Sequence, residues 1–195
     1  MLMVLVGSVV LGGATSFAQG LFPEGLRPFA NSASGWTILT VVMVWVARRA
    51  LRWSALLGAV SFVALVLGYT VVSNMRGFYF SPVFWSVVGV VVGPWVGVAA
   101  AALHQRGRWA AVGTGLLSGV LLGDSFYGIS VVMATTGWVY WTVAGVLGAA
   151  LLVSMAVRRL RAASLVTIAT VVAAATAVLM NLTFGLLSTG AVPMT

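Results

Sequence analysis

The chain of 195 residues is 62% hydrophobic and only 6% charged, with a mean hydropathy of +1.14. A soluble domain carries about a quarter charged residues, so this composition predicts an integral membrane protein with little polypeptide outside the bilayer. The formal net charge of +8 comes from arginines in short joints between apolar runs. Charge placed there reflects membrane topology, so we expect the lipid bilayer and no nucleic acid among the partners.

Three residue types that carry much of protein chemistry are missing or nearly so. The absence of cysteine excludes disulfides, thiol catalysis and thiolate metal sites. The absence of lysine removes a retinal-type Schiff base and a phosphate-loop lysine. The single histidine, His104, cannot make a multi-histidine metal site. We therefore expect no metal site, no cofactor and no catalytic group built on these residues.

The first apolar run, Met1 to Phe22, begins without a basic residue. Its Ser16-Phe17-Ala18 end has small residues at the spacing of a signal-peptide cleavage site, so cleavage near residue 18 is one interpretation. The missing positive n-region and the unbroken continuation into a second run favour a retained helix. A start codon assigned too far downstream would explain the bare N-terminus equally well.

Six more apolar runs follow the longest polar joint, Pro23 to Ser34, whose serines and asparagine are suited to cap the next helix. The seven expected spans are 1–22, 35–47, 53–72, 83–103, 109–133, 138–157 and 162–187, before a small polar tail. All but the second approach the ~20 residues that cross the hydrocarbon core, and the second is short enough to be tilted or partly re-entrant. The predicted fold class is all-α, a polytopic transmembrane bundle forming a single integral membrane domain over 1–195.

Arginines alternate between the joints. The joints after the second, fourth and sixth runs hold Arg48, Arg49, Arg52, Arg106, Arg108, Arg158, Arg159 and Arg161. The other joints hold only Arg27 and Arg76. By the positive-inside rule the N-terminus is expected inside and the C-terminus outside, in a multi-pass protein of the cell membrane.

Asp124 is one of only two acidic residues and stands inside the fifth apolar run. A carboxylate in a spanning helix costs roughly 2.5–3.5 kcal/mol on insertion scales unless a partner or water meets it. Asp124 lies fifteen positions past Trp109, about 22 Å along a helix, and hence in the outer half of a ~30 Å core. Tyr127, three positions further on, shares its face.

We predict an outward-facing, aromatic-lined pocket with Asp124 as its one anionic contact. The predicted ligand-binding residues are Asp124, Tyr127, Trp138, Trp141, Arg76, Asn74, Tyr79, Gln19 and Asn181. Such a pocket suits a flat or weakly cationic small molecule. Three other interpretations stay open: the aromatic residues form interfacial belts, Asp124 pairs with Arg76 as a structural tie, and Arg76 contacts a lipid headgroup. A lone protonatable carboxylate also fits proton coupling.

Glycines recur at every fourth position in two of the runs. They are Gly89, Gly93 and Gly97 in the fourth run and Gly115, Gly119 and Gly123 in the fifth. Small residues at this spacing let helix backbones approach closely, so packing is the expected role. The alternative is that these faces dock a partner subunit or slide during transport.

Five short stretches carry a resemblance to a known family. They are residues 29–33, 76–77, 93–94, 121–128 and 135–141, which read FANSA, RG, GP, LLGDSFYG and TTGWVYW. They resemble a family of uncharacterised small multi-spanning membrane proteins of high-GC Gram-positive bacteria, which implies a fold and no activity. The chain is also similar to the substrate-capture subunits of modular vitamin importers, whose long first loop Pro23 to Ser34 would match. Those subunits have six spans, against seven here.

Two functions from different classes follow from these observations. The first is a solute-binding or transport subunit driven by an ion gradient or an ATPase partner, since the chain has no ATP-binding segment. The second is a non-transport membrane component, such as a sensor, assembly factor or complex subunit, that docks through its glycine-rich faces. We do not expect an enzyme, because Asp124 has no second carboxylate or histidine at its depth.

Overall fold

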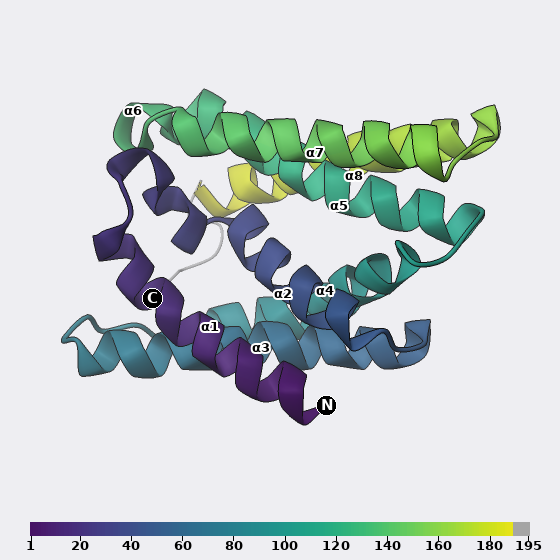
Figure 1. The fold of residues 1–195 in the computed structure, drawn as a ribbon. Helices are drawn as coiled ribbons and strands as arrows, with labels where there is room; N and C mark the ends of the chain where they lie inside the picture. The colour runs from purple at the N-terminus through teal and green to yellow at the C-terminus, as the bar shows by residue number, and fades with distance from the viewer. Residues whose placement is uncertain (189–195) are drawn as a thin grey trace. The chain divides into compact units, whose positions relative to one another are not determined.

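The computed structural model describes residues 1–188, which form helices and contain no strand. The elements are α1 (Leu2–Leu21), η1 (Glu24–Ala30), α2 (Ala33–Ala47), α3 (Leu51–Met75), α4 (Val83–Ala102), α5 (Arg108–Tyr127), η2 (Gly128–Val132), α6 (Met133–Thr136), α7 (Val139–Arg158) and α8 (Ala163–Ser188) (Figure 1). The predicted all-helical fold class is confirmed. The polar tail expected after the last span lies outside the described residues, except for its first residue.

Six helical segments are long and apolar enough to cross a membrane: α1, α3, α4, α7, α8 and the continuous stretch Arg108–Thr136. The remaining apolar run is shorter, because α2 has only 15 residues. It joins η1 at a bend of 60°, and the pair counts as a seventh span if both parts belong to one crossing. The structure therefore supports a multi-pass membrane protein with six spans, or up to seven.

Two helices extend further than the apolar pattern indicates. The third was expected to end at Val72, but α3 continues to Met75, so Asn74 lies in its last turn rather than in a loop. The fifth was expected to end near Met133, with a joint from Ala134 to Gly137. Instead α6 carries the same segment on to Thr136, and the chain turns at Gly137, where φ is +73°.

The chain divides into two compact units. Unit 1 comprises residues 1–23 and 27–101, and unit 2 comprises residues 24–26 and the described residues from 102 onward. Unit 1 contains α1 to α4, and unit 2 contains α5 to α8. The single integral domain expected over 1–195 stays a prediction.

In unit 1, α1 packs against α3 at positions occupied by small residues. A Cβ added to Gly12 would lie 2.0 Å from the carbonyl oxygen of Leu65, and one added to Gly68 would lie 2.1 Å from that of Val9. Such distances mean that the two backbones touch. Two hydroxyl pairs flank this contact, Ser8–Ser61 at 2.8 Å and Ser16–Ser73 at 2.9 Å.

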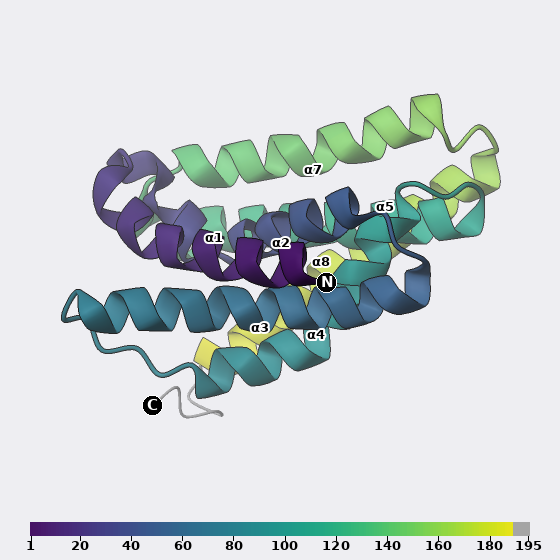
Figure 2. The same ribbon diagram turned by 60° about the horizontal axis from the view of Figure 1, so that its bottom comes forward.

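Helices α3 and α4 lie side by side in Figure 2, and their contact is equally close. A Cβ added to Gly97 would lie 2.0 Å from the carbonyl oxygen of Ser54, and one added to Gly58 would lie 2.1 Å from that of Gly93. The predicted packing role of the glycines in the fourth run is therefore confirmed, and their partner is a helix of the same chain.

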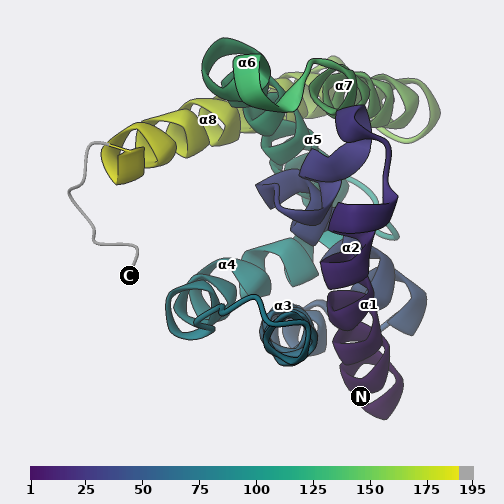
Figure 3. The same cartoon turned by 90° about the vertical axis from the view of Figure 1, so that its left-hand side faces the viewer.

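In unit 2, α5 packs against α8 through its own glycines. Cβ atoms added to Gly115 and Gly119 would lie 2.6 Å from the carbonyl oxygens of Ala169 and Ala173. The third glycine, Gly123, faces Ala177 in the same way. The packing role predicted for these three glycines is confirmed as well. Figure 3 shows α6 beside the first turns of α7, at the end of α5 where the candidate site lies.

Candidate functional site

The structure divides the nine predicted ligand-binding residues between the two units. Unit 2 holds Asp124, Tyr127, Trp138, Trp141 and Asn181, and unit 1 holds Gln19, Asn74, Arg76 and Tyr79.

Asp124 is placed by the last turn of α5, where the helix is surrounded within its own unit. Its residue surface is only 2% exposed, and that of the neighbouring Ser125 is 8% exposed. The carboxylate is not isolated, since Asp124 has an interaction partner within the protein. Burial of a charged group is tolerated only where such partners compensate for lost solvent. A buried carboxylate whose lost solvation is compensated within the protein is therefore the central feature of unit 2.

The chain changes helix type four residues after Asp124. Gly128 begins the π-helix η2, and its amide donates to the carbonyl oxygens of both Asp124 and Ser125. π-Helical turns are rare and occur frequently at functional sites. Two side-chain hydroxyls donate to backbone carbonyls at this wider turn. Ser130, within η2, donates to Phe126 at 2.7 Å, and Thr136, after it, donates to Val132 at 2.8 Å.

Trp141 covers the face of α5 that carries Gly128. A Cβ added to Gly128 would lie 2.0 Å from Cδ2 of the Trp141 indole, so the ring lies directly on the helix backbone. The ring is held in place because its Nε1 donates to Oγ1 of Thr136 at 2.9 Å. Gly128 stands one turn beyond Asp124 on the same face, and the indole therefore adjoins the face of the carboxylate.

Two further aromatic contacts lie in this part of unit 2. Tyr140, which is 4% exposed, meets the ring of Trp141 edge-on at a centroid distance of 5.0 Å. On the other side, Tyr127 packs against Phe184 of α8 at 4.8 Å. Trp138 precedes α7 and is 61% exposed, a placement typical of an interfacial residue.

Asn181 connects α8 to the residue before Asp124. Its Nδ2 donates to the carbonyl oxygen of Gly123 at 3.0 Å and to that of Ala177, one turn earlier in α8, at 2.8 Å. A side-chain amide that reaches the backbone of a neighbouring helix fixes both the spacing and the register of the two helices. The structure thus brings Asp124, Tyr127, Trp141 and Asn181 to one end of unit 2.

Unit 1 has its own polar group at the ends of α1 and α3. The Nε2 of Gln19 donates to the hydroxyl of Tyr69 at 3.0 Å, and the Oδ1 of Asn74 accepts from the amide of Phe80 at 2.9 Å. Tyr79, in contrast, is 90% exposed. The amides of Gln19 and Asn74 therefore hold this end of unit 1 together.

Arg76 follows the last residue of α3 and reaches back to α1. Its Nη1 donates to both the carbonyl oxygen and the hydroxyl of Ser16. Its guanidinium also lies over two rings, at 4.6 Å from the centroid of Phe17 and 5.4 Å from that of Phe78. Such cation–π contacts leave the edge of the guanidinium available to an acceptor.

The predicted residues do not include several groups that the structure adds to the site of unit 2. Ser125, Thr136 and Tyr140 belong to it by the contacts and burial described above. Thr114 and Ser118, ten and six positions before Asp124 in α5, lie outside this site and carry buried hydroxyl oxygens with no hydrogen-bond partner within residues 1–188. Thr114 and Ser118 are four residues apart and Ser125 follows seven later, a spacing that places all three on one face of a helix and was visible in the sequence.

The side chains of this site suit a small organic molecule better than a metal ion. Within the part of the chain that the structure describes, no three His, Asp or Glu side chains lie close enough to hold a metal. The site of unit 2 offers one carboxylate, several hydroxyls and two pairs of aromatic rings. These groups are able to make charge, hydrogen-bond and ring contacts.

Comparisons with known proteins give a family and no activity. Residues 1–188 match the sequence model described as a family of unknown function (DUF6518). Neither the curated proteins nor the solved structures include a match to the chain. The family match agrees with the predicted resemblance to an uncharacterised family of multi-spanning proteins. The bacterial source and the likeness to vitamin-importer subunits stay predictions.

Proposed function

The chain belongs to the DUF6518 family of unknown function, and we propose that it is a solute-binding or transport subunit of the cell membrane with Asp124 as the contact for its solute. In this proposal η1 and α2 form one bent crossing, so that seven spans place the N-terminus inside and the C-terminus outside. The arginine-rich joints of the sequence support that orientation.

The observation that carries the proposal is the position of Asp124 relative to η2. A protein that needed only helix packing would have no use for a carboxylate in a span, because insertion costs roughly 2.5–3.5 kcal/mol. Asparagine or serine would supply a hydrogen bond at lower cost. Here the carboxylate is buried and is followed after one turn by a π-helical segment, two features that both concentrate at functional sites.

The surrounding side chains indicate the class of solute. An anionic contact beside the rings of Tyr140 and Trp141 favours a flat molecule with a single weak positive charge, held by the carboxylate and by cation–π contacts. Energy for transport would come from an ion gradient or from an ATPase partner.

No enzymatic role is proposed. Acid–base or nucleophilic work needs two or more groups in mutual reach. The only other acidic residue of the chain is Glu24, and the only histidine is His104 at the end of α4. The proposed site acts by binding alone.

The test is equilibrium binding to the purified chain in lipid nanodiscs, with ethidium as a flat aromatic cation and phenanthridine as its uncharged counterpart. We expect saturable binding of ethidium at least tenfold tighter than that of phenanthridine, and a loss of at least tenfold in the Asp124→Asn variant. Glu24→Gln removes the other carboxylate and serves as the matched control that leaves binding unchanged. Equal ethidium binding by Asp124→Asn and the original chain would contradict the proposal.

One exposed helix face supports the second candidate function, which is a non-transport component that docks to a membrane partner. The glycine faces of α4 and α5 are filled by α3 and α8 of the same chain, so a partner would have to use another surface. Helix α8 offers one, since only 11% of its most apolar window is buried. A membrane partner that co-purifies equally with the original chain and with Asp124→Asn would favour this second function.

A further inference from the structure

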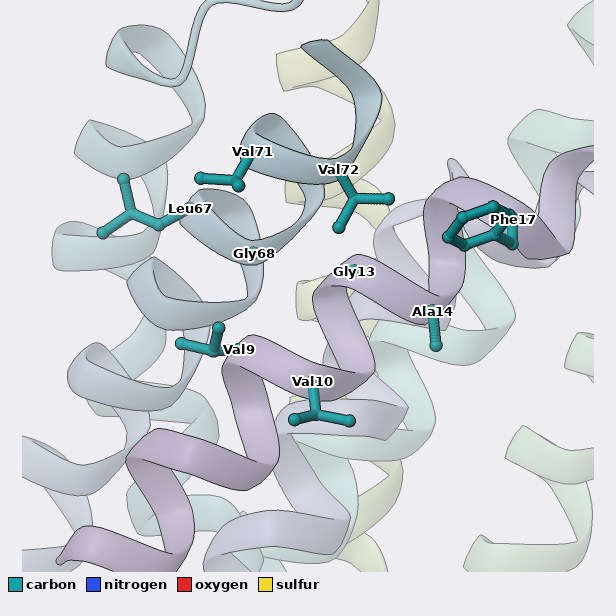
Figure 4. A pocket seen from close by; sticks show the side chains of 9 residues that line it. All are labelled: Val9, Val10, Gly13, Ala14, Phe17, Leu67, Gly68, Val71 and Val72. Carbon is teal, nitrogen blue, oxygen red and sulfur yellow. The ribbon is translucent and has the colours of Figure 1, made fainter. Parts of the chain in front are cut away.

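An apolar groove of about 440 Å³ runs between α1 and α3 in unit 1 (Figure 4). It is lined by Val9, Val10, Gly13, Ala14, Phe17, Leu67, Gly68, Val71 and Val72, without any polar side chain. Its floor is the close contact of α1 and α3 at Gly13 and Gly68, and its rims include Val10, Phe17 and Val71, each at least half exposed. The groove is therefore accessible from outside the helix pair α1 and α3.

Arg76 lies at one end of this groove. Its guanidinium is stacked on Phe17, a lining residue, and the residue itself stands one turn beyond Val72, another lining residue. Only Nη1 is used in hydrogen bonds, both to Ser16. The Nε and Nη2 groups donate to no acceptor within residues 1–188. These two groups lie on the same side of the planar guanidinium and can donate two parallel hydrogen bonds to one phosphate.

The guanidinium of Arg76 forms no ion pair within residues 1–188, where its partners are Ser16, Phe17 and Phe78. Arg76 also follows directly on the span Leu51–Met75, so it stands where hydrocarbon gives way to lipid headgroups. An exposed Tyr79 close by in the chain is typical of that depth. A cation at this depth faces lipid phosphates.

The length of the groove matches one leaflet. From Val9 to Phe17 it extends over eight residues of α1, about 12 Å at 1.5 Å per residue. One leaflet contributes about 15 Å of a ~30 Å hydrocarbon core. An acyl chain that begins at a headgroup beside Arg76 would therefore lie in the groove over most of its leaflet.

We propose that the groove between α1 and α3 is a binding site for one anionic phospholipid, with its phosphate on Arg76 and an acyl chain along the groove. A second copy of the chain is a poorer occupant. The chain has a net charge of +8 and only two acidic residues, so a copy would bring little negative charge to Arg76. This site does not depend on the role proposed for Asp124, which lies in the other unit.

The test uses the full chain in nanodiscs made of equal amounts of phosphatidylglycerol and phosphatidylcholine. After extraction into mild detergent, native mass spectrometry counts the lipids that each chain retains. We expect one phosphatidylglycerol per chain, retained at least tenfold over phosphatidylcholine. Arg76→Gln should lower this preference at least fivefold, and Arg76→Lys should lower it less, because lysine keeps the charge but loses the fork.

A second variant separates the groove from the charge. Ala14→Leu fills the groove while Arg76 and Ser16 stay intact, and it should abolish the retained lipid. Two matched controls, Ala150→Leu at an exposed position of α7 and Arg158→Gln at the end of the same helix, should retain phosphatidylglycerol as the original chain does. All variants are first checked for folding by size exclusion and by unfolding in detergent.

Three results would overturn the proposal. The first is equal retention of both lipids by the original chain, and the second is unchanged retention by both Arg76→Gln and Ala14→Leu. The third is a second copy that covers the groove, which a single introduced cysteine can detect because the chain has none. Efficient disulfide dimerisation of Ala14→Cys within the bilayer would show that a protein surface occupies the groove.

Discussion

Trp141 rests on the backbone of Gly128, with its Cδ2 only 2.0 Å from the position that a Cβ of residue 128 would occupy. The indole is 5% exposed and bonded to Thr136, so it has little room to withdraw. The contact fixes the start of α7 against the point where α5 becomes π-helical. It is the most direct link between the two segments that surround Asp124 in unit 2.

Replacement of Gly128 by alanine should therefore destabilise unit 2. The added methyl group overlaps a held ring, and overpacking of this kind costs about 1–3 kcal/mol. We expect a loss of that size in the free energy of unfolding, measured by titration of the reconstituted chain with a denaturing detergent. Gly185→Ala is the matched control, because no atom lies within 4 Å of its added Cβ, and it should be neutral or slightly stabilising. Equal free energies of unfolding for Gly128→Ala and Gly185→Ala would contradict a close contact between Trp141 and Gly128.

A second prediction concerns the crossing of α1 and α3. Gly12→Ala places a methyl group 2.0 Å from the carbonyl oxygen of Leu65, and a backbone atom cannot rotate away as a side chain can. We expect the helices to separate, with a loss of about 3 kcal/mol or more, at the upper end of the overpacking range. Gly20→Ala in the same helix meets only the end of a flexible arginine at 3.7 Å and should leave stability within about 0.5 kcal/mol.

The sequence predicts the extent of the helices better than it predicts the contacts between them. Apolar runs and arginine-rich joints predict where spans begin and end to within a few residues. The end of α3 was missed because Ser73 and Asn74 are polar residues that favour loops. In the structure Ser73 bonds to Ser16, and the amide of Arg76 still reaches the carbonyl of Val72, so the helix continues.

The candidate site was predictable only in part. Asp124 is found by its charge alone, and Tyr127 and Asn181 lie in the same unit as Asp124. The π-helix that begins at Gly128 leaves no signature in composition, and neither does the contact of Trp141 with Gly128. Arg76 belongs to unit 1 and Asp124 to unit 2, so their grouping in one pocket, which rested on membrane depth, stays a prediction.

A third prediction tests the hydroxyl pair Ser8–Ser61, which bonds α1 to α3 at 2.8 Å with both residues fully buried. Hydrogen bonds between transmembrane helices average about 0.6 kcal/mol in double-mutant cycles, with a maximum near 1.7. The cycle of Ser8→Ala, Ser61→Ala and the double variant should give a coupling energy in that range. Ser8 paired with the exposed Ser154 of the other unit is the control, and it should show no coupling.

A fourth prediction concerns the bond between α8 and α5. Asn181→Ala removes the donor to the carbonyl of Gly123 and should lower the free energy of unfolding by about 1 kcal/mol, the usual net value of one hydrogen bond. Thr183→Ala is the control two positions away, since that hydroxyl is exposed and bonds only to its own helix. A loss no larger in Asn181→Ala than in Thr183→Ala would show that the interhelical bond contributes nothing.

The last prediction separates a functional Asp124 from a structural one by stability alone. Asparagine keeps an acceptor oxygen at the same position, so Asp124→Asn loses only the difference between a charged and a neutral hydrogen bond, about 1 kcal/mol. If the carboxylate were one half of a buried ion pair that holds helices together, removal of its charge would cost about 3–5 kcal/mol, because the cation would be left uncompensated. We expect the smaller loss in detergent titration, together with the loss of ethidium binding. A loss above 3 kcal/mol would identify Asp124 as a structural tie and would remove the main support for a solute site.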